Sequence, residues 1–110
     1  MNLETRKEYI LITVEENSFN EFFKDFEKQH IKIEENHLII DFSSLNSITE
    51  KNISLFLSYA NIHVNNGTSF VLICKDIDID QFPEDFNIVP TLIEAEDIIE
   101  MENIQRDLGF

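Results

Sequence analysis

The side chains best able to ligate a metal ion or attack a substrate in this sequence are three histidines and one cysteine. His30, His37 and His63 follow one another at spacings of seven and twenty-six, so no His-x-His or His-x-x-x-His pair exists. Cys74 closes an apolar segment and has no histidine or asparagine near it in the sequence. That position favours a small core residue over a nucleophile. We therefore expect no metal site and no cysteine chemistry.

Carboxylates are the next candidates, and one short segment carries three of them at alternate positions. Asp76-Ile77-Asp78-Ile79-Asp80 has the spacing with which an EF-hand calcium loop begins. Such a loop requires glycine at its sixth position and glutamate at its twelfth, where this chain has Gln81 and Asn87. Because both requirements fail, we expect an acidic strand-to-loop edge there.

A second group of carboxylates follows two strands of the predicted sheet. Glu15 and Glu16 come after the first strand and Asp41 lies at the end of the second, where α/β sheets place ligands. This resembles receiver domains, in which an acidic pair and a phosphorylatable aspartate hold Mg²⁺. Only 24 residues separate Glu16 from Asp41, however, and Val89 stands where receivers have a lysine before a proline. A degenerate receiver-like switch that binds Mg²⁺ stays as an alternative.

Strands are predicted where every residue, or nearly every residue, is apolar, as in strands buried on both faces. Three segments have this pattern: residues 9–14 (YILITV), 38–42 (LIIDF) and 69–74 (SFVLIC). A short edge strand is expected at residues 87–89, with Pro90 blocking its extension.

Helices are predicted between these strands by capping boxes and by apolar residues at helical spacing. The boxes are Ser18-Phe19-Asn20-Glu21, Ser47-Ile48-Thr49-Glu50 and Thr91-Leu92-Ile93-Glu94. In the first helix, Phe22 and Phe26 are expected to face the sheet, because the helix carries more aromatic residues than one stripe can bury. The second helix should present one stripe and end at Gly67. That stripe is Ile53, Leu57, Ala60 and Val64, with Phe56 beside it.

This alternation predicts a single α/β domain over residues 1–110. We expect a mostly parallel four-stranded sheet covered by helices, in the order β-α-β-α-β-(short turn)-β-α. The short turn is the region around Pro83.

Charge limits the partners of such a domain. Eight basic and 22 acidic residues give a net charge of −14, and residues 76–110 hold eleven of the acidic residues with only Arg106 opposing them. A surface this negative repels phosphate backbones and anionic membranes, so we expect no direct nucleic-acid binding and no membrane binding. A basic protein partner is compatible with the charge.

The order of elements resembles the STAS domain, the fold of the anti-sigma factor antagonists and of the cytoplasmic tails of sulphate transporters. The resemblance covers residues 9–104 and lies in Leu38-Ile39-Ile40-Asp41, Asn66-Gly67, Phe70-Val71-Leu72-Ile73-Cys74 and Thr91-Leu92-Ile93-Glu94-Ala95. It implies a protein-protein interaction module that regulates a partner without catalysis.

The sequence also departs from that family. The family's first edge strand is expected to be missing or very short, and its third helix is reduced to the region of Pro83. In the antagonists, the second helix begins with an Asp-Ser pair whose serine is phosphorylated, but Thr49 and Glu50 occupy those places here. The resemblance therefore implies partner binding around Ser47, Thr49, Glu50 and Lys51 without the usual phosphorylation.

The chain also resembles short chains that carry the name ribonuclease Z. It lacks the His-x-His-x-Asp-His cluster of that metal-dependent nuclease, so it cannot itself be the nuclease. An acidic accessory partner of a nucleic-acid-processing enzyme stays as a second alternative. Our leading expectation is a non-enzymatic, cytoplasmic STAS-like module with a protein partner and no cofactor.

Overall fold

The computed structural model of the chain describes residues 1–109, whose strands form one five-stranded sheet. The strands lie in chain order across it: β1 (Asn2–Thr5), β2 (Ile10–Thr13), β3 (Leu38–Asp41), β4 (Phe70–Ile73) and β5 (Asn87–Val89). β2 to β5 are parallel to one another, whereas β1 pairs with β2 in the antiparallel sense, with Leu3 opposite Ile12. The prediction of an α/β domain is confirmed, and so are the four strands it contained.

The predicted number of strands is wrong, because β1 completes a mixed sheet of five strands. All four residues of β1 are exposed and it lies at the edge of the sheet, so it has no need of the apolar pattern that revealed the other strands. Arg6 donates its backbone N–H to the carbonyl of Tyr9 at 2.8 Å and closes the turn between β1 and β2.

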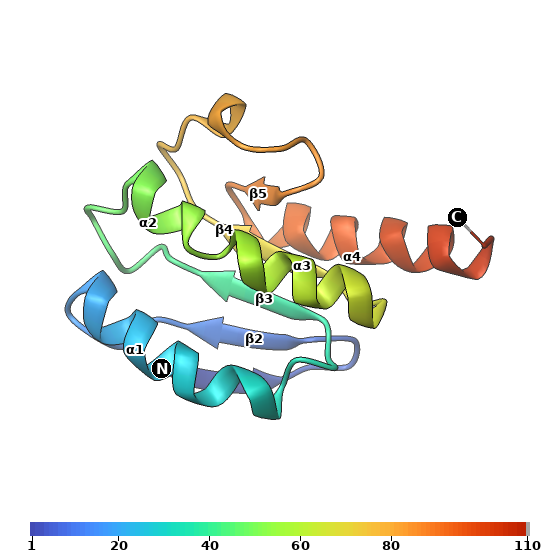
Figure 1. Cartoon of the computed structure of the whole chain (residues 1–110), viewed down its shortest axis with the longest axis horizontal. Helices are drawn as coiled ribbons and strands as arrows, with labels where there is room; N and C mark the ends of the chain where they lie inside the picture. Colours follow the sequence, from blue (N-terminus) through green and yellow to red (C-terminus); the bar gives the residue numbers. More distant parts are fainter. Residues whose placement is uncertain (110) are drawn as a thin grey trace.

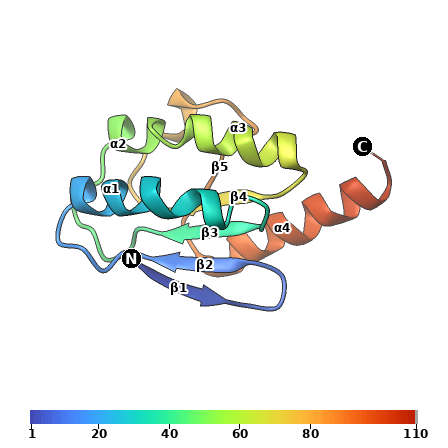
Figure 2. The same ribbon diagram turned by 60° about the horizontal axis from the view of Figure 1, so that its bottom comes forward.

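Helices cover both faces of the sheet unequally (Figures 1 and 2). On one face lie α1 (Phe19–Gln29), α2 (Glu50–Ser54) and α3 (Leu57–Asn66), and on the other lies α4 (Leu92–Asp107). Two single turns of 3-10 helix complete the chain: η1 (His30–Lys32) follows α1, and η2 (Ile79–Gln81) lies in the connection between β4 and β5. None of the helices within residues 1–109 is long and apolar enough to cross a membrane.

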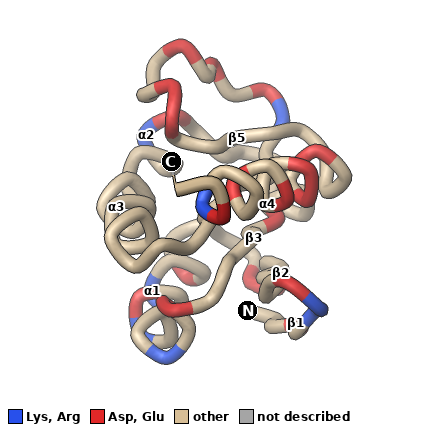
Figure 3. The backbone as a smooth tube through the Cα atoms, turned by 90° about the vertical axis from the view of Figure 1, so that its right-hand side faces the viewer, with Lys and Arg blue, Asp and Glu red and all other residues tan. Residues whose placement is uncertain are grey.

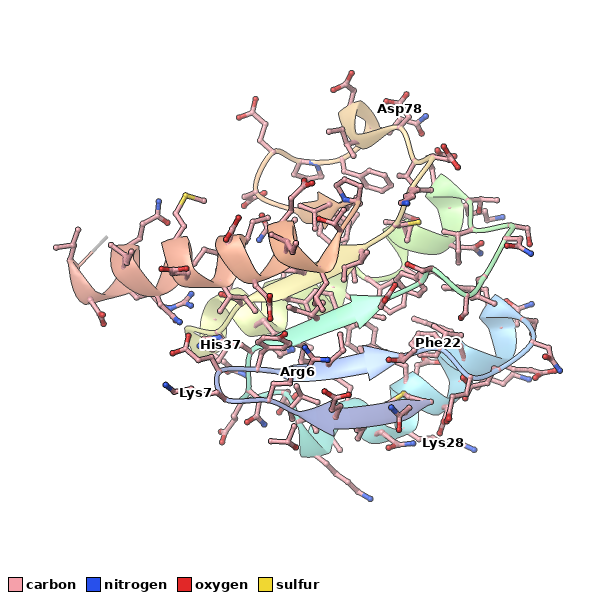
Figure 4. All side chains as sticks on the ribbon, turned by 180° about the vertical axis from the view of Figure 1, so that it is seen from behind. Arg6, Lys7, Phe22, Lys28, His37 and Asp78 are labelled. Atoms are coloured by element: carbon pink, nitrogen blue, oxygen red, sulfur yellow. The ribbon has the colours of Figure 1, made fainter. Side chains whose placement is uncertain are left out.

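The core between the sheet and α1–α3 is aromatic. Phe22 and Phe26 are both 0% exposed, which confirms their predicted role, and Phe42 of the β3 end and Phe56 pack against them. Phe23 is only half-buried and stacks on the rim of the same cluster. Figure 4 labels Phe22 on α1, beside the strands of the sheet.

The expected second helix is broken into α2 and α3, and its predicted stripe is partly wrong. The backbone N–H of Leu55 reaches Asn52 and that of Phe56 reaches Ile53, so the helix tightens into a 3-10 turn there. The buried side of the two helices is different from the predicted one, since His63 is 0% exposed and Val64 is 67% exposed. The helix ends as predicted, at Gly67 with φ 73°.

The predicted N-cap residues are confirmed for two of the three helices. Ser18 caps α1 and Thr91 caps α4, each accepting the backbone N–H three residues later. The box expected from Ser47 to Glu50 is wrong: the cap of α2 is Thr49, which exchanges two hydrogen bonds with Asn52. The side chain of Asn52 fits this exchange as well as a glutamate would, because its amide oxygen can accept the Thr49 N–H.

Candidate functional site

The candidate site lies at the carboxyl edge of the parallel strands. The segment from Phe42 to Thr49 leaves β3 at this edge and leads to α2, and residues 74–76 leave β4 beside it. Loops at this edge of a parallel sheet are where α/β proteins bind their ligands, because the strands end together and the loops are free to vary. In Figure 1 the segment runs from the tip of the β3 arrow to α2.

Two hollows flank this segment. We call the first the β3–β4 hollow, with a volume of about 260 Å³, and the second the α1 hollow, with about 280 Å³. The β3–β4 hollow is lined by Phe42, Ser43, Leu45, Asn46, Ile48, Cys74, Lys75 and Asp76. The α1 hollow is lined by Asn17, Ser18, Phe19, Ser44, Leu45, Asn46, Ser47 and Ile48. Leu45, Asn46 and Ile48 line both, so the segment forms a ridge between two concave surfaces.

Short hydrogen bonds hold the ridge in place. The carboxylate of Asp41 accepts the backbone N–H of Ser43 at 2.9 Å and also its hydroxyl, which forms a tight turn directly after β3. The hydroxyl of Ser44 donates to the carbonyl of Val14 at 2.9 Å, which ties the ridge to the end of β2. These hydrogen bonds hold the segment in one conformation against the ends of β2 and β3.

The structure brings the four predicted partner-binding residues to one place but not into one hollow. Ser47 is exposed and lines the α1 hollow. Thr49 and Lys51 are exposed and Glu50 is half-buried, and none of these three lines either hollow. They form the start of α2, directly after the ridge.

Glu50 has a role that sequence reasoning missed. Its carboxylate accepts the backbone N–H of Asp78 at 3.0 Å, so it fastens the connection between β4 and β5 to the first turn of α2. This hydrogen bond to the charged form lowers the pKa of Glu50. Glu50 consequently links helix α2 to the β4–β5 connection and is not the last member of a capping box.

Cys74 lies in the β3–β4 hollow with its thiol half-buried. Burial raises the pKa of this thiol to about 11, and nearby carboxylates, with Asp76 contributing most, act in the same direction. A thiol with such a pKa stays protonated at neutral pH, and the thiolate is the nucleophilic form. The sulfur therefore contributes an apolar contact surface to the hollow.

Each carboxylate of the Mg²⁺ hypothesis has a partner within the chain. Glu16 accepts a hydrogen bond from the amino group of Met1 at 2.7 Å, and a carboxylate oxygen of Glu15 lies 3.4 Å from the same amino group. Asp41 accepts the backbone N–H of Ser43. Across residues 1–109, no three histidine, cysteine, aspartate or glutamate side chains converge as metal ligands would. No arrangement among these residues supports the receiver-like alternative, which stays a prediction.

A buried histidine pair is the feature of the core that sequence spacing concealed. The Nε2 atoms of His30 and His63 lie 2.8 Å apart, and Nδ1 of His63 lies 2.7 Å from the hydroxyl of Thr68. All contacts are satisfied when Nε2 of His30 donates to His63 and Nδ1 of His63 donates to Thr68. Burial lowers the pKa of His63 to about 4 and also lowers that of His30, so both rings are neutral.

A second polar cluster fastens α4 to the opposite edge of the sheet. The hydroxyl of Ser69, which is 1% exposed, donates to Glu102 at 2.6 Å and accepts from Arg106 at 2.9 Å. Glu102 also accepts from Asn87, and the backbone N–H of Ser69 donates to Nδ1 of His37 at 2.8 Å. Because Ser69 is enclosed and both its hydroxyl interactions are occupied, the cluster positions α4 and leaves no free nucleophile.

The segment of residues 43–52 was expected to contain the contact surface, but the sequence did not indicate that Asn17, Phe19 and Lys75 would lie beside it in the two hollows. The signal that could have found them is topological, since they follow neighbouring parallel strands. Asp76 also adopts a left-handed backbone with φ 61°, which turns the chain away from β4 and which no sequence pattern indicates for an aspartate.

Comparison of the sequence with models of known protein families gives no match, and comparison with curated proteins gives no significant match.

Proposed function

We propose that this chain is a non-enzymatic, cytoplasmic, STAS-like interaction module that binds a protein partner through the ridge and the start of α2. The observation that carries the proposal is the ridge between two hollows, which presents exposed Ser47 and the half-buried side chains of Leu45 and Ile48. Concave surfaces beside a fixed protruding segment suit a partner's side chains on both sides of it.

The order of the elements supports the resemblance to STAS domains. An antiparallel edge strand precedes the parallel strands, which removes one of the departures expected from the sequence. The third helix of the family corresponds to η2, a single turn. The start of α2, where the antagonists carry their phosphorylated serine, is exposed and adjoins the ridge.

Binding at this place is proposed to be constitutive. Thr49 is occupied as the cap of α2, and Glu50 supplies a permanent negative charge that Asp78 holds in position. The family's off-switch adds charge to a serine at this place, and no serine stands there. Binding is therefore proposed to need neither phosphorylation at the family's switch position nor its removal.

The test starts from a partner captured from the source cells with the whole chain as bait. Its affinity is then measured by calorimetry for the wild type, for Ser47→Arg on the ridge, and for Ser58→Arg on the exposed side of α3 as the matched control. We expect Ser47→Arg to weaken binding at least about tenfold and Ser58→Arg to leave it within about twofold. Equal affinities for the two variants would place the partner elsewhere. Binding that requires prior kinase treatment would remove the constitutive part of the proposal.

A further inference from the structure

A third concave surface lies between the connection that follows β4 and helix α4. We call it the β5–α4 groove. It has a volume of about 380 Å³, within the range of roughly 300–1,000 Å³ that is typical of binding sites. Its walls include Ile79 and Phe82 from the connection, Ile88 from β5, and Ile98 from α4. It shares no residue with either hollow of the candidate site.

Large apolar side chains are exposed to solvent in and beside the groove. Ile79 is 58% exposed although it lies in a segment where acidic residues dominate. On α4, Met101 is 53% exposed and lies three residues after Ile98, so both side chains are on the same side of the helix. An exposed large apolar side chain in the wall of a groove, with a second one on the helix that forms the other wall, is typical of a surface that a partner covers.

The rim of the groove is strongly acidic. Asp80 and Glu84 line it directly. Residues 76–110 carry eleven acidic side chains, and their only basic residue, Arg106, is engaged by Ser69 and Asn103. Figure 3 shows the acidic residues on the connection at the top and on α4 below it, with β5 between them. Figure 4 places Asp78 at the outer tip of the same connection.

A groove with apolar walls and an acidic rim is complementary to a ligand that carries both apolar and basic side chains. We propose that the β5–α4 groove binds a basic amphipathic segment of a protein partner, with apolar side chains against Ile79 and Ile98 and with lysine or arginine side chains facing the rim. Complementary charge brings such a segment to the groove and fixes its orientation, while the apolar contacts supply most of the affinity. A second copy of this chain is the less suitable occupant, because each copy carries a net charge of −14.

The edge of β5 is short for binding by strand addition. β5 has three residues, and Cys74 donates its backbone N–H to the carbonyl of Val89, so that carbonyl faces β4. Pro90 follows directly and has no N–H to donate. Side-chain contacts in the groove, and not backbone pairing, are therefore the basis of the proposed recognition.

The test uses the full chain and a synthetic peptide of about 14 residues in which leucine and lysine repeat at helical spacing. Binding is measured by calorimetry at about 150 mM salt, where long-range attraction is largely screened. Ile79→Lys alters the groove, and Ile93→Lys is its matched control, since Ile93 is 72% exposed on the outer face of α4. We expect Ile79→Lys to weaken binding at least about tenfold and Ile93→Lys to change it less than about twofold.

A second pair of variants keeps the test independent of the apolar residue. Glu84→Lys reverses a charge on the rim, and Glu100→Lys reverses one on the other side of α4, beside Tyr9. We expect only Glu84→Lys to weaken binding, and we expect amide chemical shifts to change along residues 79–88 and around Ile98 when the peptide is added.

Three outcomes would overturn the proposal. Equal weakening by the groove variants and their controls would mean unspecific attraction between opposite charges. Chemical-shift changes confined to the ridge would assign the peptide to the candidate site. Self-association of the chain alone that Ile79→Lys abolishes would assign the groove to a second copy.

Discussion

The two faces of the sheet are covered in different ways. On the face of α1, α2 and α3, four phenylalanines that are at most 1% exposed pack together: Phe22, Phe26, Phe42 and Phe56. On the other face, α4 buries only Ala95 and Ile99 fully, against Leu11, Ile39 and Val71 of the sheet. The free energy gained by burying apolar side chains is roughly proportional to the apolar area that they bury. The first face therefore contributes most of the hydrophobic stabilisation.

The second face compensates with polar contacts. Ser69, Glu102 and Arg106 connect the last turns of α4 to the start of β4, and the hydroxyl of Tyr9 donates to Glu96 nearer the start of the helix. Such contacts are directional, so they fix the angle of α4 although its apolar interface is small. The face covered by α1, α2 and α3 therefore provides most of the stability. The other face holds α4, whose apolar residues Met101 and Ile104 are exposed and free to contact a partner.

The largest expected effect tests which face carries the stability. Phe26→Ala removes a ring that is 0% exposed and contacts Phe56 and Tyr59, and we expect it to lower the free energy of unfolding by about 3–5 kcal/mol. Ile99→Ala on the other face should cost about 2–3 kcal/mol, because the side chain is smaller and its cluster has fewer members to lose contact. Urea unfolding of the two variants measures both. A cost for Ile99→Ala equal to or above that of Phe26→Ala would contradict the comparison.

The next effect concerns pH on the aromatic face. The folded-state pKa of His63 is about 4, below its unfolded value of 6.5, so the unfolded chain binds more protons between these values. The stability that this difference provides is fully present above pH 6.5 and is lost as the pH falls toward 4. Between pH 7 and pH 5 the loss from His63 is about 2 kcal/mol.

His63→Gln separates this effect from the titration of the carboxylates. The variant keeps a hydrogen-bonding side chain but cannot titrate at this position. Urea unfolding at pH 7 and pH 5 gives the free energy of unfolding of both proteins. We expect the wild type to lose about 2 kcal/mol more than the variant when the pH falls from 7 to 5. Glu34, whose carboxylate lies 3.9 Å from Nδ1 of His30, is the only acidic partner recorded within 4 Å of the pair among residues 1–109, and it lies too far for a hydrogen bond. Equal pH dependence in wild type and variant would show that the histidine pair titrates normally.

Much of this architecture could be predicted from the sequence, because apolar runs and caps act locally. The parallel strands, the caps at Ser18 and Thr91, the turn at Gly67 and the Phe22–Phe26 pair all follow from neighbours in the chain. β1 was missed because an exposed edge strand has no apolar pattern, and the break before α3 was missed because a single 3-10 turn has no clear sequence signal.

The sites were harder to predict than the fold, since they depend on contacts between distant residues. His30 and His63 are 33 positions apart and meet only because α1 and α3 pack side by side. The link from Glu50 to Asp78 spans 28 positions in the same way. The resemblance to STAS domains implied partner binding at the start of α2, which stays a prediction, and it did not indicate that Leu45 and Ile48 would line two hollows.

A smaller effect tests the polar fastening of α4. Glu102→Ala removes the acceptor of Ser69 and Asn87 and leaves the buried hydroxyl of Ser69 without a carboxylate, so we expect a loss of about 1–3 kcal/mol in the free energy of unfolding. Glu100→Ala, two residues earlier on an exposed position, should change stability by less than about 0.5 kcal/mol. If both variants behave alike, the small apolar cluster alone holds α4.

The smallest expected effect concerns the hydrogen bond from the Asp78 amide to Glu50, which joins the β4–β5 connection to the start of α2. Neither residue belongs to the hydrophobic clusters on the two faces of the sheet, so the loss of this contact leaves both clusters intact. We therefore expect Glu50→Ala to leave the unfolding midpoint unchanged. The local effect should be clear, because the Asp78 amide loses its acceptor and exchanges faster with solvent. Lys51→Ala, at the next position of the same helix, is the matched control and should change neither measurement.

The same amide also reports the charge of Glu50 directly. In the wild type, the Asp78 amide shift should follow the titration of Glu50 with a midpoint below the usual value of a glutamate, since the hydrogen bond from Asp78 lowers the pKa of this carboxyl. The titration should vanish in Glu50→Ala and persist in Lys51→Ala. If the wild-type amide does not follow a carboxyl titration, the connection after β4 moves independently of α2. The ridge and the β5–α4 groove would then be separate surfaces with no shared attachment.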